Sequence, residues 1–127
     1  MEVQYTLEEE FMEYEGRLKT VIDSCTADFE IDLGFGLTTI KRLKLWGIVQ
    51  LKDKAKQRAA IALIKKSIGK SLVSIHFQEE PIPHHEPYFV TISFESKRNN
   101  NAQDTKLITV FLNELLLLNK LVSEYMH

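Results

Sequence analysis

Histidines and a lone cysteine are the residues of this 127-residue chain that could most directly ligate a metal or attack a substrate. The run His84-His85-Glu86 lies between two prolines, and His76 precedes it on a predicted strand. A transition-metal site needs three or four converging ligands, whereas adjacent side chains of an extended segment point in opposite directions. We therefore interpret this run as an exposed polar loop and predict no metal site there.

Cys25 is the only cysteine, which excludes an internal disulfide framework and a cysteine-rich zinc site. A nucleophilic thiol needs a nearby base and groups that stabilise an oxyanion. No histidine is close to Cys25 in the sequence, and no oxyanion-hole motif is visible. We predict a buried or turn-lining thiol.

Basic residues are concentrated in the middle of the chain. Residues 36–70 contain ten Lys or Arg and one Asp, a net charge of +9, whereas residues 1–35 carry −8 and residues 71–127 carry −3. Such a segment marks either a surface that faces a polyanion or a strip that the acidic segments neutralise, and the sequence leaves both readings open. The candidate contacts to phosphates or to an acidic partner are Arg42, Lys44, Lys52, Lys56 and Arg58, with Trp46 and Tyr88 as candidate stacking residues.

Length and composition indicate one domain over residues 1–127, with an acidic, loosely ordered segment at residues 1–12. No apolar run reaches the roughly 20 residues that span a bilayer, and the start of the chain is acidic where a signal peptide would be basic. We expect a soluble cytoplasmic protein that does not contact a membrane.

Alternating apolar residues predict the strands that must position these side chains. A first strand ends at Asp23-Ser24, Phe29 to Phe35 forms a second strand that bends between Gly34 and Gly36, and a third strand stops near Gly47. Further strands are predicted at 71–78 and 88–95, an exposed turn at 97–104, and a short edge strand at 108–110.

Helical periodicity appears in two places. Residues 53–68 place Ala60, Leu63, Ile64 and Ile68 on one stripe, and Gly69 follows as a helix-ending glycine. Residues 112–125 predict a second, leucine-rich helix whose apolar surface exceeds one stripe, so that residues 112–122 are a candidate homodimer contact. The order of elements predicts an α+β fold: a five-stranded OB-type barrel with two to three helices, closed so that its short strands leave no exposed edges.

Several segments, in order, resemble the staphylococcal nuclease family, including its phage-encoded branch. The similar segments are Glu15-Gly16-Arg17-Leu18-Lys19-Thr20-Val21-Ile22-Asp23-Ser24-Cys25-Thr26, then Phe29 to Gly36, then Arg42-Leu43-Lys44-Leu45-Trp46-Gly47-Ile48, and finally Leu112-Asn113-Glu114-Leu115 with the leucines that follow. The resemblance covers roughly residues 13–125. It implies the nuclease-type barrel, and it allows the family's active positions to be located in this chain.

Those positions are occupied by residues unsuited to the family's reaction. Its two metal-binding aspartates map onto Cys25 and Val49, which offer none of the oxygen ligands that Ca²⁺ prefers. Its catalytic glutamate maps onto Lys52, and its two arginines map onto Lys44 and near Pro87. Asp23 and Thr26 are retained, and Asp23 has a structural reason to persist because aspartate accepts backbone N–H bonds in tight turns.

These replacements imply a catalytically inactive, nuclease-like binding module without a cofactor, which contacts nucleic acid or a protein and comes from a phage or mobile element. Two alternatives remain open at this point. One is a metal-dependent endonuclease with rearranged ligands such as Asp23, Asp28 or Asp32. The other is a protein-interaction or inhibitory protein that pairs through its leucine-rich helix.

Overall fold

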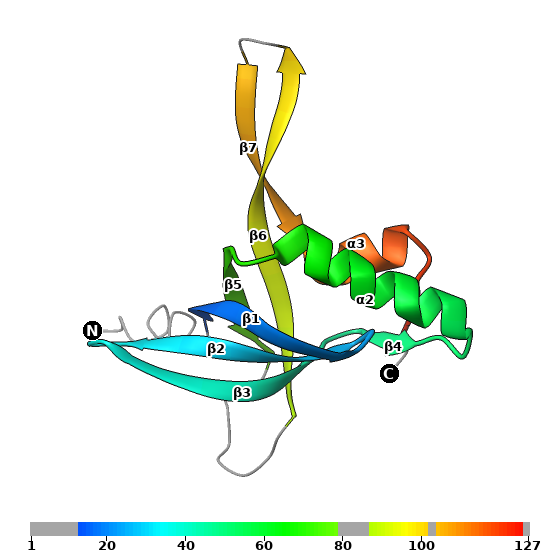
Figure 1. The fold of residues 1–127 in the computed structure, drawn as a ribbon, viewed down its shortest axis with the longest axis horizontal. Helices are drawn as coiled ribbons and strands as arrows, with labels where there is room; N and C mark the ends of the chain where they lie inside the picture. The colour runs from blue at the N-terminus through cyan, green and yellow to red at the C-terminus, as the bar shows by residue number, and fades with distance from the viewer. Residues whose placement is uncertain (1–12, 79–86, 102–103, 126–127) are drawn as a thin grey trace, which may run out of the picture.

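The computed structural model describes residues 13–78, 87–101 and 104–125 (Figure 1). Its elements follow in the order β1 (Glu13–Asp23), β2 (Thr26–Gly34), β3 (Leu37–Leu45), β4 (Ile48–Gln50), α2 (Lys54–Ile68), β5 (Leu72–Phe77), β6 (Tyr88–Asn101), β7 (Asp104–Phe111), α3 (Leu112–Leu118) and β8 (Val122–Glu124). The predicted acidic segment at residues 1–12 and the His84-His85-Glu86 run lie outside the described residues.

Five strands close into a barrel. The sheet runs β3-β2-β1-β5-β6 with antiparallel neighbours, and a parallel pairing of β3 with β6 joins its two ends. Leu43, Lys44 and Leu45 face Tyr88, Phe89 and Val90 in that parallel pair. The α+β class and the closed five-stranded barrel with two helices are therefore confirmed, and the strand order is consistent with the OB type.

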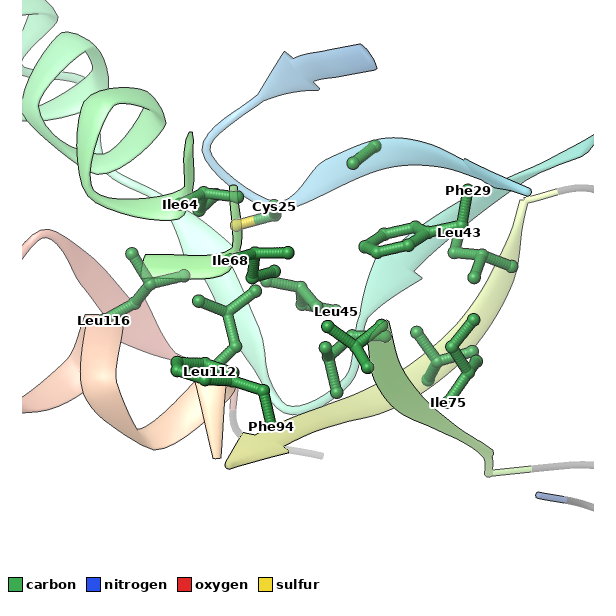
Figure 2. Packing of buried hydrophobic residues seen from close by; sticks show 14 of the residues in the cluster. Cys25, Phe29, Leu43, Leu45, Ile64, Ile68, Ile75, Phe94, Leu112 and Leu116 are labelled. Atoms are coloured by element: carbon green, nitrogen blue, oxygen red, sulfur yellow. The ribbon is translucent and has the colours of Figure 1, made fainter. Parts of the chain in front are cut away.

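The core lies inside the barrel and under the two helices (Figure 2). Alternation along β2 and β5 buries Phe29, Ile31 and Ile75, and the predicted stripe of α2 buries Ile64 and Ile68 against the same cluster. Each such buried side chain contributes about 1.5–3 kcal/mol of hydrophobic stabilisation. Asp53 caps α2 by accepting backbone N–H bonds from the first turn, and Gly69 ends the helix at φ 55°, as the sequence predicted.

Two glycine positions shape the barrel strands. A Cβ at Gly16 would lie 2.7 Å from the Glu30 carbonyl oxygen, so β1 can approach β2 closely only without a side chain there. The predicted bend at 34–36 is the β2–β3 hairpin turn, in which Gly34, Phe35 and Gly36 all have positive φ. Phe35 is fully exposed at its tip.

The C-terminal helix is shorter than the sequence predicted. α3 ends at Leu118, because Lys120 adopts a φ of 59° and Leu121 N donates to Leu116 O, the hydrogen bond that closes a helix end. The chain then forms β8, which pairs with β4. The prediction of one helix to Tyr125 was therefore wrong: a lysine takes the left-handed position that the sequence rules assign to glycine. Leu112 and Leu116 are buried, so the excess of leucines serves mainly the core.

The predicted turn at 97–104 is shorter than expected, because the chain reverses only between Asn101 and Asp104. β6 continues to Asn101, and β7 resumes at Asp104 and pairs with it back to Phe111. Beyond the barrel these strands form a two-stranded ribbon that projects from the body (Figure 1). The residues 97–101 carry no alternation of apolar and polar side chains, which is the pattern that reveals a strand. No helix among the described residues is long and apolar enough to cross a bilayer.

Candidate functional site

The turn between β1 and β2 is held by side-chain hydrogen bonds. Asp23 Oδ1 accepts from Cys25 N at 2.8 Å, which confirms the structural role predicted for Asp23. Ser24, fully buried, donates from its Oγ to Gln50 Oε1 at 2.8 Å, and its backbone N donates to the same oxygen at 3.1 Å. The two bonds from Ser24 attach the turn to β4, and the bond to Asp23 holds its backbone, so the polar side chains of Asp23 and Ser24 have structural roles.

Cys25 is the residue at which this turn enters the core. It is 2 % exposed and lies on the α2 side of the cluster, toward Ile64 and Ile68 (Figure 2). Burial raises the pKa of its thiol, and the hydrogen bond with Ser24 and the charge of Lys44 only partly oppose this. The thiol is therefore protonated at neutral pH, and its burial confirms the prediction of a buried, turn-lining thiol.

The structure brings some of the positions named by the resemblance together. Thr26 is the register partner of Lys44, and Leu45 N donates to Cys25 O at 2.8 Å, so the turn and the end of β3 are adjacent. Val49 is 37 % exposed on β4, where it pairs with β8, and Lys52 is exposed before α2.

Pro87 lies immediately before β6, whose first residues Tyr88 and Phe89 pair with Leu43 and Lys44 of β3. It borders a shallow depression with a volume of about 450 Å³, whose other described lining residues are Asp28, Ile40 and Arg42.

The three aspartates considered as rearranged metal ligands already have partners. Asp23 holds the turn, Asp32 Oδ1 accepts from Gly34 N at 2.8 Å, and Asp28 forms a two-pronged ion pair with Arg42 across β2 and β3. The hydrogen bond from Arg42 lowers the pKa of Asp28. Among the described residues, no three His, Cys, Asp or Glu side chains converge in a way that could hold a metal ion.

An aromatic and cationic surface lies on the outside of the barrel where β3 pairs with β6. Lys44 faces Phe89 in the parallel register, and the ring of Trp46 meets that of Phe89 edge-on, with centroids 5.7 Å apart. Phe89 is 40 % exposed, and Lys44 and Trp46 are half-buried. We call Lys44, Trp46 and Phe89 the seam surface. It brings two predicted site residues, Lys44 and Trp46, against Phe89, which comes from a distant segment of the chain.

Sequence reasoning missed Phe89 and selected Tyr88. Tyr88 is in phase with buried Val90 and Ile92, and its ring packs edge-on against Phe77 at 5.9 Å, so it belongs to the margin of the core. Phe89 occupies the outward, polar phase of the same strand. An aromatic residue at a polar-phase position is the signal that could have identified it.

The basic residues at the start of α2 form a separate group. Lys52, Lys56 and Arg58 are exposed, in or just before the first turns of α2 and outside the strands that carry the seam surface. Of the ten basic residues in 36–70, Arg42 alone forms an ion pair with a described acid. Within the described part of the chain, Arg42 is therefore the cation of this segment that is ion-paired with the acidic strip.

Comparisons with known proteins give no further guide to what this site does. No protein-family model, no curated protein and no solved structure matches the chain.

Proposed function

We propose that this chain is a non-enzymatic module that binds single-stranded nucleic acid on the outside of its barrel. The observation that carries the proposal is the adjacency of a cation and two partly exposed aromatic rings at the seam surface. Proteins that bind single strands combine basic groups that track the phosphates with aromatic side chains on which bases stack. In this proposal Lys44 contacts a phosphate, and Trp46 and Phe89 contact bases.

The charge around the barrel supports the same partner. Arg42 precedes Lys44 on the same outward face of β3, and Asp28 holds its guanidinium in one orientation. The cations of α2 and of the segment before it have no described acid as a partner. Cations left free of ion pairs attract a polyanion over a distance set by the Debye length, about 8–10 Å at moderate salt.

We further propose that the barrel is a degenerate relative of the staphylococcal nuclease family. If the chain is such a relative, two observations support the absence of nuclease catalysis. Cys25, at a metal-ligand position, is a buried protonated thiol in the core, and Lys52, at the general-base position, is an exposed ammonium. A metal-dependent hydrolase needs oxygen ligands and a base at these two places.

Binding is tested by fluorescence anisotropy with a labelled oligo(dT) strand and with a duplex of the same length, each at 50 and 200 mM NaCl. We expect tighter binding of the single strand, weakening with salt by the release of counterions. Lys44→Glu combined with Phe89→Ala should weaken binding by about 5- to 150-fold, because one stacked base is worth about 1–3 kcal/mol.

The matched control is Lys65→Glu, which makes the same change of charge at an exposed cation but at the far end of α2. This control should change affinity far less than the seam variant, and equal losses would show that only overall charge matters. A cleavage assay with Ca²⁺, Mg²⁺ and Mn²⁺ tests the absence of catalysis. EDTA-sensitive cutting that disappears in Asp23→Ala would refute it.

A further inference from the structure

The ribbon formed by β6 and β7 has unsupported edges. β6 pairs with β5 only as far as Ser93, and from there to Asn101 its described partner is β7 alone. β7 ends the sheet order, and no described backbone hydrogen bond from another element reaches residues 107–111. A two-stranded ribbon is at best marginally stable in water, and beyond Ser93 the described pairing gives this one no third strand.

The two edges of the ribbon differ in their protection. The β6 edge carries Glu95 and Lys97, charged residues of the kind that discourage a further strand from pairing. β7 contains the uncharged run Leu107-Ile108-Thr109-Val110-Phe111, without proline or bulge. Three of its side chains are notably exposed: Leu107 by 63 %, Ile108 by 38 % and Phe111 by 43 %. Such a run on a free edge pairs readily with another strand.

Hydrogen bonds elsewhere on β6 identify the backbone groups that face the free edge. Phe89 O accepts from Gln78 N, whereas Val90 O and Ile92 N bond to Asn113, on the side away from β5. The backbone N–H and C=O groups of the even-numbered β6 residues therefore point toward β7, where Phe94 pairs with Val110 and Ser96 pairs with Ile108. This alternation leaves the N–H and C=O groups of Leu107 and Thr109 directed outward.

We propose that β7 pairs antiparallel with β7 of a second copy of this chain, which makes a continuous four-stranded sheet of two ribbons. A second copy is the occupant that fits, because an antiparallel dyad aligns the uncharged run with itself and places no like charges opposite one another. Pairing about a dyad closes after two chains, and the charged β6 edges limit further growth. The dimer contact therefore lies on β7, apart from both the seam surface and the leucines of α3.

Sedimentation equilibrium of the full chain across a concentration series tests this proposal. We expect the wild type to reach twice the 14.7 kDa mass of the chain. Thr109→Pro removes one outward N–H while leaving the β6–β7 hydrogen bonds intact, so it should shift the species to monomer. Thr109→Val keeps that N–H and the branched side chain, and it should remain a dimer.

Leu107→Lys is a second variant at an exposed position, where folding does not depend on the side chain, and it should also give monomer. Circular dichroism melts confirm that each variant folds. A wild type that is monomeric at all concentrations overturns the proposal. So does a dimer that survives Thr109→Pro and Leu107→Lys but dissociates in Leu118→Lys on α3. Loss of nucleic-acid binding in the seam variant has no bearing on this outcome, so the two proposals fail independently.

Discussion

Replacing Asn113 by alanine should reveal how the fold positions the seam surface. Asn113 is the second residue of α3 and is 7 % exposed. Its Oδ1 accepts from Ile92 N at 3.2 Å, and its Nδ2 donates to Trp46 O at 2.9 Å and to Val90 O at 3.3 Å. One side chain thus ties α3 to β6 and to the turn that carries Trp46.

The expected loss of stability follows from the groups left without partners. In Asn113→Ala, Ile92 N loses the acceptor seen here and Trp46 O loses the donor seen here, whereas Val90 O keeps its bond from Trp46 N at 2.8 Å. A buried polar group without a partner costs about 1–3 kcal/mol, which applies to Ile92 N, whereas the partly buried Trp46 O loses about one ordinary hydrogen bond, so the expected total is about 2–4 kcal/mol. Because domains of this size are stable by only about 5–15 kcal/mol, a large part of the total is at stake.

Urea denaturation measures this loss as a fall in the midpoint with an unchanged m-value. Asn119→Ala is the matched control, since Asn119 is exposed and its Nδ2 donates to Leu115 O at 2.8 Å, so its loss should cost less than about 1 kcal/mol. We also expect weaker oligo(dT) binding by Asn113→Ala at temperatures where it is still folded, because the Trp46 backbone is released. A loss below 1 kcal/mol, or one equal to that of Asn119→Ala, would refute the reasoning.

Two further predictions concern single residues. Phe35 has a φ of 56° and Gly36 one of 76°, so Phe35→Asn creates the Asn-Gly pair that is preferred in such hairpin turns. This substitution should raise the free energy of unfolding by about 1 kcal/mol, measured as a Tm about 4 °C higher. An unchanged or lower Tm would contradict the prediction. Cys25 should react with a thiol reagent at pH 8 only as fast as the protein opens, because burial both hides the thiol and raises its pKa. Rapid labelling of the native protein, compared with labelling in urea, would show that the thiol is accessible.

The barrel could be predicted from the sequence where one face of an element is buried. The alternation through Phe29 and Ile31 and the helical stripe through Ile64 and Ile68 show in the sequence which side of each element meets the core. Residues 97–101, where the ribbon extends beyond the barrel, have no such pattern, and there the prediction failed. It also failed at Lys120, because a left-handed lysine is disfavoured locally and the tertiary pairing of β8 with β4 outweighs that preference.

The site was predictable only in part. The charge excess of residues 36–70 and Trp46 are visible in the sequence, but their grouping depends on the parallel pairing of β3 with β6. That pairing joins segments more than 40 residues apart, and no local pattern encodes it. Phe89 therefore becomes a site residue only when the barrel closes and brings it beside Lys44.

The same geometry makes a return to metal binding difficult under the proposed relationship to nucleases. An aspartate is tolerable at Val49, which is 37 % exposed. At Cys25 it would place a carboxylate at a 2 % exposed position within an apolar cluster, where a charge without a partner is strongly unfavourable. The turn no longer needs an ion to hold it, because Asp23 and the Ser24–Gln50 hydrogen bonds already fix its backbone. Restoring one ligand would therefore destabilise the fold before any second ligand could compensate.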